Sequence, residues 1–274
     1  QIMGNAQVSG RARVFRRAVV MGNAGVQGKA RVGGRARILA DSAVHGDASV
    51  FGSALVSGNA QVYDRAAIYD NAEVGGNAAI YGNAHIRGTA KIYGDADVRG
   101  EAQVYDNASL NGDSLIAGKA RVHGDANVIG ANVFGQAEVY GNARIFGGEV
   151  IDKGAVAGHA TLEKCNVSGE ALISGRVEAV NSEFKHSGVL SNTCVLLNEV
   201  VEDLSQLTVI QSGDRILVYH KGLVSLYWDQ GHFRETFEAE FEQATPKKAF
   251  KLVKDPVIKG FLYAIANAYP DDSK

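Results

Sequence analysis

Residues 56–80 of this protein read VSGNAQVYDRAAIYDNAEVGGNAAI, and this stretch shows the pattern that decides the fold. An Ile, Val or Leu stands at every sixth position from Ile2 to Val128, which makes 22 such positions. Four residues after each of the first 21 comes a small residue, which is Ala nineteen times and otherwise Ser42 or Ser114. A short fixed period of this kind is typical of a solenoid.

One repeat unit consists of Ala-x-Val-x followed by a turn pair such as Gly58-Asn59. Four residues that alternate inward and outward form a short strand, and Gly, Asn and Asp tolerate the positive φ that a sharp turn needs. Three units then make one coil of about 18 residues, in which each strand pairs with the strand 18 residues further on. The sequence therefore predicts a three-sided prism with an aliphatic interior.

The pattern [Ile/Val/Leu]-x-[Gly/Asp]-x-[Ala/Ser]-x resembles the hexapeptide-repeat family, also called the isoleucine-patch family. The match covers residues 2–128 tightly and about sixty further residues loosely. This resemblance implies a left-handed parallel β-helix of triangular section, which is often trimeric and most often an acyltransferase. The usual crossover rule alone would favour the opposite hand.

The six-residue spacing shortens to five at three places, which are Val128–Val133, Ile145–Val150 and Leu162–Val167. We therefore expect an all-β solenoid of about ten coils over residues 1–200, strictly regular over residues 2–128 and irregular over residues 129–200. A different composition follows, since the chain's three prolines and its one tryptophan come after residue 200. Residues 201–274 are predicted to form a small α+β domain that caps the last coil.

Within that domain the sequence predicts three strands, Leu207–Gln211, Arg215–His220 and Leu223–Trp228. Amphipathic helices are predicted at Glu235–Ala244, from Pro246 onward and at Val257–Ala268. Repeats followed by a strand ending in Trp, then Gly231-His232-Phe233 and an acidic helix, resemble uncharacterised tailed-phage proteins. Those proteins carry Gly-Asn-Ala-x-Val repeats before a small C-terminal domain.

The net charge of −2 is unevenly distributed. Residues 1–40 contain no Asp or Glu and eight basic residues, namely Arg11, Arg13, Arg16, Arg17, Lys29, Arg31, Arg35 and Arg37. Two cysteines, Cys165 and Cys194, fit a reducing compartment, and no apolar run approaches the length of a membrane span. We expect no membrane association and a location in the virion or the host cytoplasm.

Cations of the first two coils recur on one side of the predicted prism and at its two corners. This clustering predicts a site for an anionic ligand or an acidic partner, with a solvated basic end as the alternative. The residues of this predicted site are Arg11, Arg13, Phe15, Arg17, Lys29, Arg31 and Arg35. The same side carries aromatic residues near multiples of 18, which we interpret as a stabilising ladder of Phe15, Phe51, Tyr69, Tyr105 and Tyr140.

Another side carries an apolar stripe, which predicts a contact surface between copies of the chain. Scattered surface apolar residues are the alternative interpretation. The stripe consists of Met3, Val19, Met21, Leu39 and Leu55. A homotrimer is what the family resemblance implies for this surface.

An enzymatic function finds little support in the sequence. Acyltransferases of the resembled family commonly use a His as general base, often under an extruded loop, but residues 2–128 contain no insertion. His85 and His123 share a side two coils apart, and no third His stands where a three-His metal site would need it. P-loop, nucleophile-elbow and CxxC motifs are absent. We therefore predict no catalytic residue, no metal site and no cofactor.

Three functions are weighed in this order. The first is a non-enzymatic, rigid structural or interaction rod, such as a phage fibre, decoration or attachment element, whose C-terminal domain contacts another phage or host protein. The second is a phage protein that sequesters an anionic small molecule or a host protein. The third is a hexapeptide-repeat acyltransferase.

Overall fold

The computed structural model describes residues 1–158 and the backbone of later strands as far as Trp228. Side chains are described for residues 1–158 and for Val167 and Ile173. The turns between the later strands and residues 229–274 fall outside this description. The helices predicted in the last forty residues therefore lie outside the described residues.

Short strands form three parallel sheets, and every third strand of the chain belongs to the same sheet. Sheet 1 contains β1 Gln7–Val8, β4 Gly25–Val26, β7 Ala43–Val44, β10 Gln61–Val62, β13 Ala79–Ile80, β16 Asp97–Val98, β19 Leu115–Ile116, β22 Asn132–Val133, β25 Glu149–Val150, β28 Asn166–Val167, β31 Glu183–Lys185 and β34 Val201–Asp203. Sheet 2 contains β2 Arg13–Val14, β5 Arg31–Val32, β8 Ser49–Val50, β11 Ala67–Ile68, β14 His85–Ile86, β17 Gln103–Val104, β20 Arg121–Val122, β23 Glu138–Val139, β26 Ala155–Val156, β29 Ala171–Ile173 and β32 Gly188–Leu190. Sheet 3 contains β3 Val19–Val20, β6 Arg37–Ile38, β9 Leu55–Val56, β12 Glu73–Val74, β15 Lys91–Ile92, β18 Ser109–Asn111, β21 Asn127–Ile129, β24 Arg144–Phe146, β27 Thr161–Glu163, β30 Val177–Val180 and β33 Cys194–Leu196.

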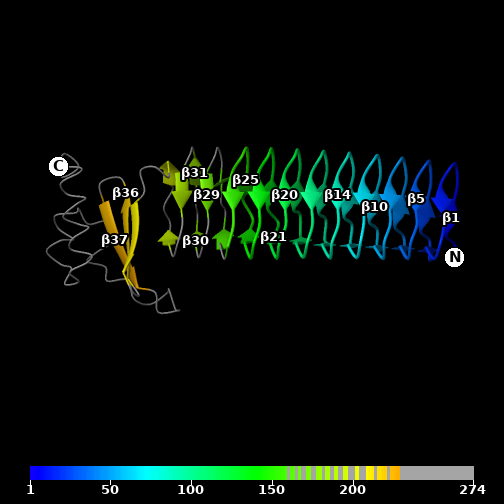
Figure 1. The fold of residues 1–274 in the computed structure, drawn as a ribbon, viewed down its shortest axis with the longest axis horizontal. Coiled ribbons are helices and arrows are strands. Elements are labelled where there is room, and N and C mark those ends of the chain that lie inside the picture. Colours follow the sequence, from blue (N-terminus) through cyan, green and yellow to red (C-terminus); the bar gives the residue numbers. More distant parts are fainter. Residues whose placement is uncertain are drawn as a thin grey trace.

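These sheets are the sides of a straight rod, and the chain climbs by about eight turns over residues 7–156 (Figure 1). Strands of successive turns pair in parallel with the predicted offset, as Gln61 opposite Ala79 shows. The backbone N–H of Gln61 donates to the Ala78 carbonyl at 2.9 Å, and equivalent bonds recur in every turn of this region. The prediction of a β-solenoid with one strand per six residues is confirmed.

Aliphatic side chains fill the interior, as the six-residue pattern predicts. Val62, Ile80 and Val98 have no exposed surface, and the same holds for each equivalent residue from Val20 to Val128. Val8 and Val14 in the first turn are only partly buried, and Ile2 is 54% exposed. Ile2 differs because it contacts a turn on one side only, through its bridge to Val20.

The small residue after each turn pair is buried at a corner of the prism. Ala is fully buried there from Ala24 onward, and the two serines are equally buried. Each serine hydroxyl donates to a nearby carbonyl, Ser42 to Leu39 and Ser114 to Asn111, both at 2.6 Å. A hydroxyl is therefore accepted at this corner because its hydrogen bond is satisfied locally.

The turns need positive φ and leave little room for a side chain. Gly58 has φ 66°, and a Cβ placed on it would lie 2.7 Å from the carbonyl oxygen of Gly76 in the next turn. Asp replaces Gly at some of these positions, and the Asp64 carboxylate then accepts a bond from the Gly82 N–H at 3.2 Å. Gly and Asp thus recur in the turn pairs for the reason that the sequence pattern suggests.

The first two shortenings of the repeat fall at one corner, between sheets 3 and 1. They change the pairing offset, so that Leu115 lies opposite Asn132 and Asn132 opposite Glu149. Gly130 and Gly147 make these two corners, and nothing lies within 4 Å of a Cβ built on either. The deletions shorten successive turns at the same place, and the three sheets continue without interruption.

A fourth sheet lies after the solenoid strands in sequence. Its strands β35 Thr208–Ser212, β36 Arg215–His220 and β37 Leu223–Trp228 are antiparallel and correspond closely to the three predicted ranges. In the described part of the chain, no helix has the length and apolarity that a bilayer span requires.

Candidate functional site

The predicted basic residues come together on the first two turns of sheet 2 and its two corners. Arg13 and Arg31 lie side by side in β2 and β5, because these strands pair in register. Arg11 and Lys29 stack at the corner between sheets 1 and 2, and Arg17 and Arg35 stack at the corner between sheets 2 and 3. We call these six cations, together with Phe15, the basic face.

All six cations of the basic face are exposed. The Lys29 ammonium lies 3.8 Å from the Asp47 carboxylate, but both side chains are at least half exposed, so this ion pair is weak. The Arg31 guanidinium lies 5.7 Å from the centre of the Phe51 ring. Since residues 1–40 contain no carboxylate side chain, the positive potential of these two turns is not neutralised within them.

Packing against a second aromatic ring holds Phe15 in place among the cations. Phe15 and Phe51 meet edge to face with their centres 5.8 Å apart. They meet over Gly33, where an added Cβ would lie 2.8 Å from Phe15 and 2.9 Å from Phe51. The missing side chain of Gly33 therefore lets two rings from non-adjacent turns pack against each other.

A hollow of about 620 Å³ adjoins the basic face at the N-terminal end of the rod. Its apolar lining comes from Ile2, Val8, Ala12, Val14 and Phe15, and Arg13 and Arg31 add two guanidinium groups. This combination offers an apolar surface next to positive charge.

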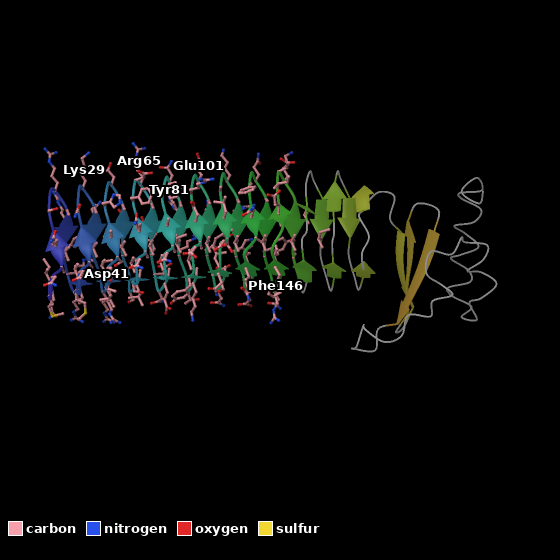
Figure 2. All side chains as sticks on the ribbon, turned by 180° about the vertical axis from the view of Figure 1, so that it is seen from behind. Lys29, Asp41, Arg65, Tyr81, Glu101 and Phe146 are labelled. Atoms are coloured by element: carbon pink, nitrogen blue, oxygen red, sulfur yellow. The ribbon has the colours of Figure 1, made fainter. Side chains whose placement is uncertain are left out.

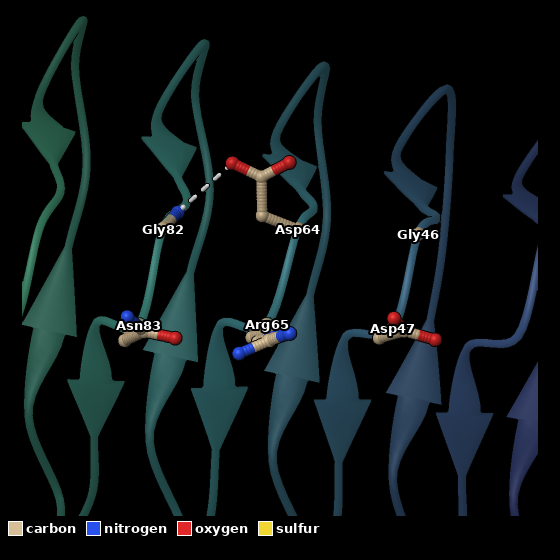
Figure 3. Close-up of a pocket in the computed structure, with 6 residues that line it drawn as sticks. All are labelled: Gly46, Asp47, Asp64, Arg65, Gly82 and Asn83. Carbon is tan, nitrogen blue, oxygen red and sulfur yellow. Dashed lines mark hydrogen bonds between the residues drawn. The ribbon is translucent and has the colours of Figure 1, made fainter.

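A second hollow, of about 420 Å³, follows the corner between sheets 1 and 2 (Figure 3). Asp47, Arg65 and Asn83 project from successive turns there, and Asp64 accepts the bond from Gly82 described above. Figure 2 shows Lys29, Arg65 and Glu101 along this same edge of the rod. Positive and negative side chains are mixed along this corner, so its surface is neither positive nor negative overall.

The predicted aromatic ladder lies on sheet 2, and the structure adds members to it. Phe51 stacks on Tyr69 with centres 6.0 Å apart. Further along, Tyr105 and Tyr140 stack on the two faces of His123, at 4.6 and 5.4 Å. Parallel rings at these distances stabilise adjacent turns, which supports the structural interpretation of the ladder.

A second ladder on sheet 1 was not predicted. His45, Tyr63 and Tyr81 stack with centres 5.1 and 4.8 Å apart, and Arg99 donates to the Tyr81 hydroxyl at 3.0 Å. These four residues are spaced by 18 in the sequence, so the period that revealed the first ladder could have revealed this one.

The two histidines considered for catalysis have different surroundings. The His123 Nε2 lies 2.9 Å from the Glu138 carboxylate, and its Nδ1 faces the Asp106 carboxylate at 3.9 Å. With tyrosines on both ring faces, His123 is engaged on every side. His85 is exposed in β14. Among the described residues, no three His, Cys, Asp or Glu side chains are placed to hold a metal ion.

The predicted apolar stripe lies on sheet 3. Met3 and Met21 are 41% and 37% exposed, and Leu39 follows them in the next turn. Val19 and Leu55 are not adjacent, because Arg37 lies between them in the register of β3, β6 and β9. The sequence analysis missed Phe146, which belongs to the same outward column as Met21 and is 40% exposed.

Comparisons with known proteins extend this description only at the level of the fold. Residues 6–22 match the YdcK Beta solenoid repeat family, a stretch of about one turn. No curated protein sequence matches this chain. Among solved structures, the UDP-N-acetylglucosamine acyltransferase of Arabidopsis is similar over 100% of this chain and 96% of its own, with 13% identity and a TM-score of 0.28.

Proposed function

We propose that this protein is a non-enzymatic, rigid rod that binds an acidic or polyanionic partner through the basic face. The observation that carries this proposal is the register of Arg13 and Arg31, with further cations at both adjoining corners. Six cations on two turns, without a carboxylate side chain in residues 1–40, form a surface that attracts anions and binds them with several side chains at once.

The regular stack of turns supports the role of a rod. Each turn donates backbone hydrogen bonds to the next, and the interior is continuous from Val20 to Val156. We propose that the rod is left-handed, that it extends to about ten coils over residues 1–200, and that residues 201–274 form a small domain for attachment.

The biological setting that we propose is a phage particle, in which the rod is a fibre, decoration or attachment element. The motif near Trp228 supports this setting through its resemblance to tailed-phage proteins. Mass spectrometry of purified virions tests it, and finding the protein only in the infected cytoplasm would contradict it.

Sequestration of a small anionic ligand is the second candidate function. The hollow beside Arg13 and Arg31 favours it, because an apolar lining and two guanidinium groups together suit an anion with an apolar part. Native mass spectrometry of freshly purified protein tests this candidate through a co-purified ligand.

Acyl transfer remains the third candidate, and its general base would be His85 or His123. Acetyl-CoA turnover that is lost on substitution of either histidine would support this candidate.

Charge reversal tests the main proposal. In the Arg13→Glu/Arg31→Glu variant, we expect the dissociation constant for heparin to rise at least tenfold, because two central cations become repulsive. The matched control is Arg65→Glu/Arg87→Glu, which changes the net charge equally with two exposed arginines outside the basic face. Binding is measured by fluorescence anisotropy with labelled heparin. Equal losses in both variants would show that net charge alone drives binding.

A further inference from the structure

The outward face of sheet 3 gathers exposed apolar side chains beside its first strand, β3, and again at its eighth strand, β24. Five large hydrophobic residues are notably exposed in the described part of the chain, and Met3, Met21 and Phe146 share one column of this face. Leu39 and Ile129 belong to the same column, one turn nearer to its middle. Such a pattern on one side of a rod indicates a contact surface.

Midway between β3 and β24, this face carries opposite charges in adjacent turns. Glu73 in β12 and Lys91 in β15 are register partners. Glu73 accepts a bond from the Tyr93 hydroxyl at 2.5 Å, whereas Lys91 is exposed and has no ion pair within the described residues. A positive charge without a partner therefore stands one turn away from a carboxylate at the centre of the face.

The two groups of apolar side chains and the charged pair between them are arranged symmetrically on this face. Within the part of sheet 3 that runs from β3 to β24, β12 and β15 stand in the middle: β3 comes three strands before β12, and β24 comes three strands after β15. Met21 directly follows β3, and Phe146 ends β24. A two-fold axis along the strands, between β12 and β15, places Met21 of one copy opposite Phe146 of the other. Each outward column then faces the same column of the second copy.

We propose that two copies of this protein associate face to face and antiparallel through sheet 3, about that axis. Met21 then packs on the partner's Phe146, and Leu39 packs on the partner's Ile129. Glu73 faces the partner's Lys91, and the symmetry forms this ion pair twice. Met21, Leu39 and the two central charges thereby each meet a complementary group.

Charge complementarity favours this arrangement over a parallel dimer or trimer. In a parallel association about an axis along the rod, residues at the same height approach each other. An axis beside the column of Glu73 and Lys91 therefore brings Lys91 to Lys91 and Glu73 to Glu73. Like charges at a contact oppose association. In the antiparallel pair, Arg37 faces the partner's Asn127, and the aliphatic stem of Arg144 covers the partner's Val19.

The available area suffices for a stable dimer. From β3 to β24 the face spans seven strand spacings, which is about 34 Å, and six extended residues give each side a width of at most about 20 Å. The product is roughly 700 Å² per copy, close to the ~800 Å² per partner of standard interfaces. Sheet 3 therefore offers enough surface without any contribution from other parts of the chain.

Substitutions that introduce opposite charges at Met21 and Phe146 test the proposal in the full chain. We expect Met21→Lys and Phe146→Glu each to raise the dimer dissociation constant at least tenfold. The double variant should recover most of the loss, because the new ammonium group of one copy would then face the new carboxylate of the other. Tyr69→Lys is the control, since Tyr69 is 36% exposed but lies outside sheet 3. Sedimentation equilibrium measures the constants. A monomeric wild-type protein, or a double variant weaker than both singles, overturns the proposal.

Thiol cross-linking separates the antiparallel pair from parallel assemblies. Facing sheets lie about 10 Å apart, which is more than a disulfide spans. In a chain whose Cys165 and Cys194 are replaced by Ser, we expect a short bismaleimide to join Met21→Cys of one copy to Phe146→Cys of the other. Either substitution alone leaves its thiol about 34 Å from its copy in the partner, far beyond the reach of this reagent. Rapid cross-linking of the Met21→Cys single variant, or a trimer in sedimentation, overturns the antiparallel arrangement.

Discussion

At the scale of single residues, the turns show how backbone conformation selects the sequence. Arg16, Ala40, Asp64, Asp70, Asp106 and Asp152 adopt positive φ where other turns have Gly. Three of the aspartates compensate for this conformation, because Asp64, Asp70 and Asp106 each accept a bond from an N–H of the following turn. The methyl group of Ala40 offers no such bond. Asp is therefore the residue that best replaces Gly at this position.

Among the described residues, Tyr93 has the largest shift of pKa. Burial, followed by the hydrogen bond and charge of Glu73, raises the pKa of Tyr93 to about 12. In the unfolded chain the phenol ionises near pH 10, so between about pH 10 and 12 the folded state holds more protons than the unfolded state. The stabilisation is complete below pH 10 and is lost as the pH rises through 12.

We therefore expect Tyr93→Phe to flatten the decline in unfolding free energy between about pH 10 and 12. Urea titrations at a series of pH values measure this slope. Glu73→Gln is the matched control, because it removes the charge but keeps the burial, and its slope should lie between those of wild type and Tyr93→Phe. An unchanged slope in Tyr93→Phe would contradict the assignment.

At the scale of strands, no element of the solenoid is stable by itself. Most strands contain two residues, so each depends on the strands before and after it in the same sheet. Ile86 in β14 has no exposed surface, whereas its neighbour His85 points outward and is exposed. Substituting each of these two adjacent residues therefore measures separately how much the interior and the surface contribute to the unfolding free energy.

We expect Ile86→Ala to lower the unfolding free energy by about 2–4 kcal/mol, because it leaves a cavity that rigid sheets cannot close. His85→Ala should change it by less than about 0.5 kcal/mol. Hydrogen exchange should show faster opening in β11 and β17, the sheet neighbours of β14, and little change further away. Uniformly faster exchange along the whole rod would instead indicate a single cooperative unit.

The sequence pattern predicted the columns of this rod because one period governs interior, turns and surface together. Arg13 beside Arg31, and the burial of Val62, follow from the six-residue spacing alone. Phe146 was missed because the shortened corners change the offset, which moves it into the column of Met21 only after the first deletion. Arg37 between Val19 and Leu55 was overlooked although these three residues are spaced by 18, so the period alone could have shown that the apolar stripe is interrupted there.

At the scale of the whole molecule, the two proposals combine into a geometric consequence. The proposed axis runs along the strands of sheet 3, so the corner between sheets 2 and 3 lies on the same side of both copies. The basic faces then open toward one side of the dimer, at its opposite ends. They are separated by between six and seven turns, or about 30 Å along the rod. One long polyanion could therefore contact both.

We expect the wild-type dimer to bind long heparin chains at least tenfold more tightly, per basic face, than heparin fragments shorter than about 30 Å, because the second contact becomes intramolecular. Met21→Lys should abolish this preference for length while leaving the affinity for short fragments unchanged, since Met21 lies outside the basic face. Arg13→Glu/Arg31→Glu should instead lower the affinity for both lengths. Surface plasmon resonance with immobilised protein at low density measures all three. A length preference that persists in monomeric Met21→Lys would mean that the long chain contacts more of one rod, and the two basic faces would then act separately.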